Sequence, residues 1–211
     1  MIVVTTPKII TMVKIDGLHF QPWVGSRYYD NGNLFLFGES HYLDDVPNEE
    51  DDFSAGYDNM TIETIRDNHL AEKDMRTPYF RNIGRLFYPN DYYTIWNEIS
   101  FANAIQIGMP NAKSQPGSRE IATIAPAFRL YLDVLKPSKV LVLSKRLWNY
   151  WLPEDNGQYV RQISANGKYS TVWEYQYEGG RCLAMGIKHP SWMFGYSCHD
   201  WRPLVDKFLS L

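Results

Sequence analysis

The stretch LFLFGESHY, residues 34–42, is an apolar run that ends at a glycine and continues directly into polar side chains. A short apolar run without alternation is typical of a strand that is covered on both faces. The residues that follow Gly38 are Glu39, Ser40, His41 and Tyr42. Ligands of open α/β sheets sit beyond the carboxyl ends of the strands. The stretch therefore predicts an α/β sheet with a polar site at its carboxyl edge.

Length and composition indicate one ordinary globular domain over residues 1–211. Of the 211 residues, 45% are hydrophobic and 21% are charged, which is sufficient for a core of normal size. No run of 18 apolar residues occurs, so no transmembrane helix is expected. The first residues lack the basic segment and the cleavage site of a signal peptide. We therefore expect a cytoplasmic monomer that does not bind membranes.

The number of cysteines limits the kinds of metal site that the chain can form. Cys182 and Cys198 are the only two cysteines. They are too few for a disulfide framework, a four-cysteine zinc site or an iron–sulfur cluster. A reducing compartment fits this usage. We expect neither a metal nor a cofactor.

One acidic stretch, DDVPNEEDD at residues 44–52, sets the sign of the net charge of −3. Without its six acids the chain has 21 basic and 18 acidic residues, a net charge of +3. The stretch is interpreted as a solvated surface loop or as a charged flap beside the site that follows Tyr42. The overall acidity speaks against a protein that coats nucleic acid, because phosphate binding is largely electrostatic. Basic residues that could line a local groove are Arg81, Arg85, Lys113, Arg119, Lys145, Lys188 and Arg202.

Other apolar runs predict the remaining strands and helices. Strands are predicted at residues 34–37, 95–105, 139–144 and 182–187. An extra strand at 170–177 is expected to pair with the last of these through a turn at 178–180. Helices are predicted at 61–70, 77–87, 118–135 (kinked or broken at Pro126) and 202–211. This order predicts an α/β fold, a three-layer α/β/α sandwich with a mostly parallel central sheet.

A second polar turn, HPSW at residues 189–192, follows the last predicted strand. The carboxyl ends of parallel strands share one edge of a sheet. The GESHY and HPSW turns should therefore meet there, although they are far apart in the sequence.

Together these segments resemble the uracil-DNA glycosylase superfamily. GESHY (38–42) is similar to its first signature and HPS (189–191) to its second. NAIQIGMPNAKSQPGSREI (103–121) resembles the strand, proline-rich loop and helix start that follow the base-reading asparagine of that family. LDVLKPSKVLVLS (132–144) is similar to its helix–Lys-Pro–strand segment. RTPYFRNIGRLF (76–87) resembles the segment that supplies an aromatic ring to stack on the flipped base.

The resemblance implies a DNA glycosylase that hydrolyses the N-glycosidic bond of uracil or another modified base, with DNA as its partner. Such an enzyme flips the base into a pocket. Positive charge then develops on the sugar, where a carboxylate can orient water and offset the charge. Negative charge develops on the base, where a hydrogen-bond donor stabilises it. Glu39 and His189 are the catalytic residues expected for these two tasks.

Substrate-binding roles follow from the same resemblance. Asn103 is expected to read the base edge, with Asn97 as a competing choice. Tyr79, or its neighbour Phe80, could stack on the base. Tyr42 could form the pocket wall that screens base substituents.

Further contacts are expected beyond the base. Gly38 and Ser40 belong to the first signature, Ser191 could hold a phosphate, and Met193 falls where the family places an apolar wedge. His41 is either a second functional histidine or a packed one. Many active members have Asp or Asn in place of Ser40, and members with a glutamate directly after the glycine usually carry four cysteines.

Two other functions fit parts of the sequence. The same fold could bind DNA or a nucleotide without cleaving it. LFLFGES also resembles the first block of GDS-type ester hydrolases, with Ser40 as nucleophile. There the catalytic histidine lies three residues after an aspartate, whereas position 186 is Gly, and His199 and Asp200 are adjacent. The triad is therefore incomplete.

Overall fold

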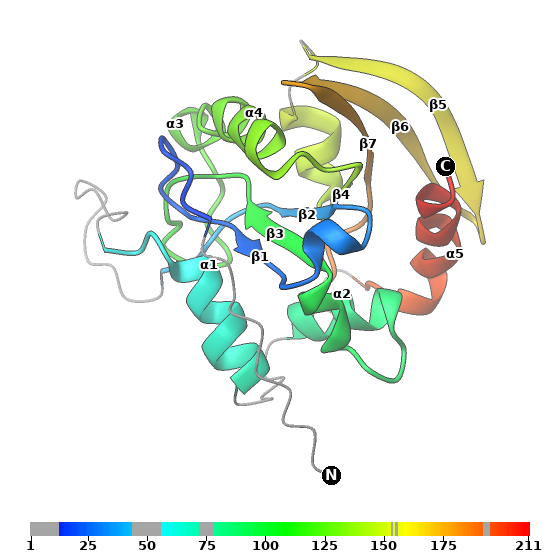
Figure 1. Ribbon diagram of the computed structural model, residues 1–211, viewed down its shortest axis with the longest axis horizontal. Coiled ribbons are helices and arrows are strands. Elements are labelled where there is room, and N and C mark those ends of the chain that lie inside the picture. The colour runs from blue at the N-terminus through cyan, green and yellow to red at the C-terminus, as the bar shows by residue number, and fades with distance from the viewer. Residues whose placement is uncertain (1–12, 44–55, 72–77, 153, 155, 192–194) are drawn as a thin grey trace.

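The computed structural model describes residues 13–43, 56–71, 78–152, 154, 156–191 and 195–211. Its strands form a seven-stranded sheet in the order β1-β3-β2-β4-β7-β6-β5 (Figure 1). The strands are β1 (Trp23–Val24), β2 (Leu34–Gly38), β3 (Ile99–Asn103), β4 (Lys139–Val142), β5 (Gly157–Ala165), β6 (Lys168–Tyr177) and β7 (Gly180–Gly186). The α/β class predicted from the sequence is therefore correct.

The expectation of a mostly parallel sheet is wrong, because the sheet is mixed. The central strands β3, β2, β4 and β7 run parallel to one another. On one side of these central strands, β1 pairs antiparallel with β3. On the other side, β5, β6 and β7 form an antiparallel meander. Tight turns join the strands of this meander, and two-residue turns can connect only antiparallel strands.

The β6–β7 hairpin is the one predicted from the sequence, since Tyr177 pairs with Gly180. The β5–β6 hairpin was missed. Asn166 and Gly167 join its strands, both with positive φ (50° and 70°). A two-residue Asn-Gly turn in this conformation is a strong hairpin signal, so the sequence did contain the information.

Both faces of the central strands are buried. Phe35, Phe37 and Val142 point into one hydrophobic cluster, whereas Leu36 and Leu141 point into the other. All five are fully buried, as expected for strands without polar alternation. The first cluster is completed by helix α4 and the second by helices α2 and α5, so helices pack on both faces (Figure 1).

The helices lie close to the predicted ranges. They are α1 (Met60–Glu63), α2 (Pro78–Phe87), α3 (Ser118–Ile121), α4 (Ile124–Leu135) and α5 (Cys198–Leu209). Further helical segments are η1 (Tyr28–Asp30), η2 (Thr64–Ala71), η3 (Thr94–Asn97) and η4 (Leu147–Trp151). None of the described helices is long and apolar enough to cross a membrane.

Two helix boundaries differ from the predictions. The break before α4 falls at residues 122–123 rather than at Pro126. Pro126 lies in the first turn of α4, where the backbone N–H groups have no partner within the helix. α5 begins four residues earlier than predicted, because the Ser197 side chain caps it by accepting a hydrogen bond from the Asp200 backbone N–H.

Candidate functional site

The two predicted polar turns lie at the same edge of the sheet. Glu39 follows β2, Asn103 ends β3, and His189 lies just beyond β7. β2, β3 and β7 belong to the parallel part of the sheet, so their carboxyl ends point in one direction. The segment after β4, which includes Arg146, begins at this edge as well. The edge therefore collects one carboxylate, one amide, one imidazole and one guanidinium.

Gly38 provides the space that the Asn103 side chain occupies. The two residues are directly paired in the parallel register of β2 and β3. A β-carbon on Gly38 would lie 2.1 Å from the Oδ1 atom of Asn103 and 3.0 Å from the Tyr79 hydroxyl oxygen. The backbone of Asn103 is fixed by Gln106, whose amide donates to the Asn103 carbonyl at 3.0 Å. Glycine at position 38 thus lets the Asn103 amide lie against the end of β2.

Gly38→Ala should destabilise the protein by about 1–3 kcal/mol, the usual cost of overpacking a filled interior. The new methyl group would displace the Asn103 amide, so the damage should be located at the site. Urea denaturation measures the change in the free energy of unfolding. The control is a double-mutant cycle with Asn103→Ala, which removes the atom in the way. If Gly38→Ala costs as much in the Asn103→Ala background, the clash is not with Asn103.

Glu39 is held in place by residues that follow β4. It is only 6% exposed. Its Oε2 atom accepts hydrogen bonds from the Ser144 hydroxyl at 2.7 Å and from Nε of Arg146 at 3.4 Å. Its Oε1 atom accepts from Nη2 of Arg146. The guanidinium thus bridges both carboxylate oxygens.

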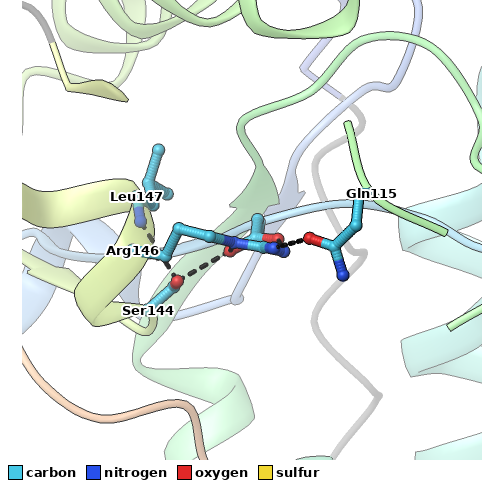
Figure 2. A network of polar contacts seen from close by, with 5 residues as sticks. Gln115, Ser144, Arg146 and Leu147 are labelled. Carbon is cyan, nitrogen blue, oxygen red and sulfur yellow. Dashed lines mark hydrogen bonds and ion pairs between the residues drawn. The ribbon is translucent and has the colours of Figure 1, made fainter. Parts of the chain in front are cut away.

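A wider network fixes Arg146 and Ser144. Figure 2 shows Arg146 reaching Gln115, to whose side-chain oxygen Nη1 of Arg146 donates. The guanidinium also lies over the Trp151 ring, 4.7 Å from its centroid. The Ser144 hydroxyl oxygen accepts from the Leu147 backbone N–H at 3.2 Å. A carboxylate held in this way has a fixed orientation, and Oε1 keeps an acceptor position that a water molecule can use.

A ring stack and a hydrogen bond help to orient the His189 ring. It stacks on Tyr79 with ring centroids 4.8 Å apart and planes 28° apart. Its Nδ1 atom accepts from the Ser191 backbone N–H at 3.3 Å. A neutral imidazole carries its hydrogen on the other nitrogen in that case. His189 is therefore an Nε2–H donor when neutral.

Electrostatics favour this neutral form. Burial lowers the pKa of His189 below its ordinary value. The Glu39 carboxylate opposes the shift, and the Arg146 guanidinium adds to it. These influences place the three groups in one electrostatic neighbourhood, as the predicted meeting of the two turns requires.

Helix α2 contacts the second turn, residues 189–191, through two of its side chains. Tyr79 lies in its first turn and stacks on His189. Burial raises the pKa of the Tyr79 hydroxyl, and Tyr42 and Glu39 raise it further, so both lie near this hydroxyl. The Asn82 side chain donates to the Pro190 carbonyl at 2.7 Å. Tyr42 and Tyr79 thus lie near Glu39 and His189.

The alternative site residues Phe80 and Asn97 lie away from the candidate site. Phe80 packs in the core against Trp96 and Phe101 rather than at the site. Asn97 precedes β3 and so lies at the opposite end of that strand from Asn103. These contacts favour Tyr79 over Phe80 and Asn103 over Asn97.

His41 is a packed histidine. It is 7% exposed, and its ring centroid lies 4.6 Å from that of Phe20. Its Nε2 atom is hydrogen-bonded to the Thr61 hydroxyl at 2.8 Å, and burial lowers its pKa to about 4. Ser40, which is partly buried, has no hydrogen bond to the described residues. His41 therefore does not activate Ser40, and among the described residues Ser40 has no contact with a base, which the nucleophile of an ester hydrolase needs.

The end of the second turn is described only in part. Among the described residues, the buried Oγ atom of Ser191 has no hydrogen-bond partner. A ligand oxygen could satisfy it, in line with the predicted phosphate contact. Met193, the predicted wedge, and the acidic stretch 44–52 lie outside the described residues.

Sequence reasoning missed four residues of the site: Asn82, Gln115, Ser144 and Arg146. For Ser144 and Arg146 a signal existed, because Ser144 ends the predicted strand 139–144 and Arg146 follows it, as GESHY follows its own strand. Asn82 and Gln115 carry no such signal. In the described part of the chain, no three His, Cys, Asp or Glu side chains gather closely enough to hold a metal ion.

Comparisons of the chain with protein-family models and with curated proteins found no match. What the site can do must therefore be argued from its own geometry.

Proposed function

We propose that the protein is a DNA glycosylase-like hydrolase that cleaves the N-glycosidic bond of uracil or another modified base. The observation that carries the proposal is the grouping of Glu39, Asn103, Tyr79 and His189 at one sheet edge. The group contains the Glu39 carboxylate, which is paired with Arg146, and the neutral His189 imidazole, which can donate a hydrogen bond. Cleavage of a glycosidic bond needs both, at opposite ends of the breaking bond.

The architecture gives secondary support. Helices on both faces of four parallel central strands are compatible with the three-layer α/β/α arrangement of the uracil-DNA glycosylase superfamily. The β5–β6 hairpin extends the sheet on one side and makes it mixed. Fold alone does not define function, so the proposal depends on the side chains at the carboxyl edge.

Glu39 would act on the sugar. As the bond to the base breaks, positive charge develops on the anomeric carbon. A fixed carboxylate nearby offsets that charge and accepts a hydrogen bond from the attacking water. Arg146 and Ser144 hold the carboxylate, so it need not reorganise during the reaction. The same ion pair reduces the negative charge that Glu39 presents, and a slow enzyme would be consistent with it.

His189 would act on the departing base. The base leaves as an anion whose charge is shared between ring nitrogen and carbonyl oxygens. A neutral Nε2–H group can donate to such an oxygen. Tyr79 would hold the imidazole plane through the observed stack. That Tyr79 also stacks on the base itself stays a prediction.

Asn103 would select the base. Its side chain is largely buried and has no hydrogen bond to the described residues, although the backbone around it is firmly held. An amide offers one donor group and one acceptor, which suits a pyrimidine edge that presents the reverse pattern. Specificity from such a buried polar contact is large, because a mismatched base leaves the amide unpaired.

Asn103→Asp should change which base is accepted rather than abolish cleavage of all of them. The substitution replaces the amide donor by a second acceptor. A base that presents a carbonyl to position 103 should be cleaved about 10²-fold or more slowly relative to one that presents an amino group. The measurement is kcat/KM on paired oligonucleotides that differ only in the target base. An equal loss on every base would mean that Asn103 does not read the base.

The proposed activity is tested with purified protein and a panel of oligonucleotides. The panel contains uracil, hypoxanthine, xanthine and modified cytosines, in single and double strands. Alkali cleavage at abasic sites reports base release. Release from at least one member, lost in Glu39→Gln, supports the proposal, and no release from any member contradicts it.

The Arg146–Glu39 ion pair favours a second candidate function. A carboxylate neutralised by a guanidinium can serve to shape a pocket rather than to catalyse, and Ser40 stands where many active members have Asp or Asn. The protein would then bind DNA or a nucleotide without cleavage. Fluorescence anisotropy with the same oligonucleotides separates the two candidates: binding that depends on Asn103 and His189, without base release, favours the binding module.

A further inference from the structure

A pocket lies at the same sheet edge as the candidate site, on the side of the meander of β5, β6 and β7. Its volume is about 350 Å³. The side chains that line it include Lys145, Asn149, Lys168, Tyr169, Thr171 and Trp201. They come from the segment after β4, from the start of β6 and from α5. No acidic residue is among the described residues that line it.

Adjacent residues connect this pocket to the candidate site. Arg146 reaches Glu39, whereas Lys145 reaches the start of β6. The Ser170 hydroxyl, which accepts from Lys145, itself donates to the Gly186 carbonyl at the end of β7 at 2.7 Å. The pocket is therefore tied to the carboxyl end of the strand that precedes His189. A nucleic-acid strand that enters the candidate site could pass directly into it.

The Lys145 ammonium group is fixed in the pocket by two hydrogen bonds to described residues, which leaves one N–H group for a ligand. Its Nζ atom donates to the Ser170 hydroxyl at 3.0 Å and to the Tyr169 carbonyl at 3.3 Å. An ammonium group has three donors, so these contacts with described residues leave one for a ligand. Burial lowers the pKa of Lys145 to about 8. An anion beside it would favour the charged form and recover part of that cost.

Lys168 adds a second positive charge. Its Nζ atom lies 5.9 Å from the centroid of the Trp201 ring, and that of Lys145 lies 5.8 Å from the same centroid. Both ammonium groups are therefore gathered around one indole. Lys168 is also 3.5 Å from Oδ2 of Asp200, an acid that borders the pocket from outside. Two lysines against one bordering acid leave the pocket positive.

Tyr169 provides an exposed aromatic surface beside these charges. Its side chain is 64% exposed, although it is large and apolar. The Lys145 ammonium lies 6.0 Å from its ring centroid. Proteins that bind single strands combine basic grooves with aromatic rings on which bases stack, in the same way.

We propose that the pocket between Lys145, Lys168 and Trp201 binds a backbone phosphate of a nucleic-acid strand, with the neighbouring base on Tyr169. The inference rests on the proposed function only in that it takes the substrate to be nucleic acid. It assigns the pocket to a nucleotide that flanks the one held at Glu39 and His189. The pocket thus contributes to affinity and not to bond cleavage.

The test measures binding to an oligonucleotide that contains only normal bases, so it does not depend on catalysis. Lys145→Gln and Lys168→Gln should each weaken binding about 5-fold or more at low salt. The double variant Lys145→Gln/Lys168→Gln should reduce the slope of log affinity against log salt concentration by about 0.7, the value for one phosphate contact on a single strand. Tyr169→Ala should weaken binding with little change in that slope. The matched control is Lys139→Gln, because Lys139 begins β4 at the opposite edge of the sheet.

A second measurement uses the wild-type protein and so avoids any folding defect of the variants. Amines are acylated at pH 8 with and without the oligonucleotide, and the modified lysines are identified by mass spectrometry. The oligonucleotide should protect Lys145 and Lys168 but not Lys139. Equal modification in both samples would overturn the proposal.

The outcomes separate this inference from the proposed function. Base release with unaltered affinity and KM in both lysine variants rejects the pocket and keeps the glycosylase. Lysine-dependent binding without base release from any substrate keeps the pocket and rejects the glycosylase. Lysine-dependent binding of polyglutamate, with no binding of the oligonucleotide, overturns the inference and indicates an acidic protein partner.

Discussion

Replacing Glu39 by Gln should lower the rate of base release by about 10²-fold or more, the usual scale for losing a general base. The amide keeps the size of the side chain and can still accept from Arg146. It removes the negative charge that offsets the developing positive charge on the sugar. Binding of an oligonucleotide with only normal bases should change little, so the loss should appear in kcat rather than in KM.

The matched control is Glu98→Gln. Glu98 is also paired with an arginine, Arg27, but lies before β3 at the other end of that strand. It should leave kcat unchanged. Thermal denaturation of both variants separates lost stability from lost catalysis. If Glu39→Gln retains the full rate, Glu39 is a structural partner of Arg146 and the catalytic proposal is wrong.

Replacing His189 by Ala should lower kcat on the order of 10²-fold, because it removes the donor to the departing base. The effect should be smaller in His189→Gln, whose amide can place an N–H near the position of Nε2. Both variants lose the stack on Tyr79 to a similar extent. A smaller loss in the glutamine variant therefore reports hydrogen bonding rather than packing.

His199→Ala is the control for this pair. His199 lies in the first turn of α5 with its side chain 91% exposed, and should contribute nothing to the rate. The measurement is single-turnover base release at saturating enzyme, which separates the chemical step from binding. Equal losses in His189→Ala and His189→Gln would indicate that the ring acts by packing. In that case His189 is a positioning residue and not the donor.

The sequence by itself determined the strands β2, β4 and β7 and the edge at which they end, but neither β1 nor β5. Apolar runs without alternation predicted β2 and β4, because strands covered on both faces typically have such a pattern. The polar turns that follow β2 and β7 predicted that Glu39 and His189 lie at one edge. This inference needs no side-chain detail, since the carboxyl ends of parallel strands coincide. The hairpin of β6 and β7 could also be predicted from neighbouring residues, since a Gly-containing turn defines it.

The tertiary structure alone decided how the side chains at that edge meet. The Glu39 carboxylate is paired with Arg146, which is 107 positions away in the sequence, and Tyr79 stacks on His189. His41 stands two residues from Glu39, yet it points to Thr61 and is buried. Such contacts depend on the three-dimensional course of several segments at once. Local pattern records only which residues a strand or helix presents, and not which of them face one another.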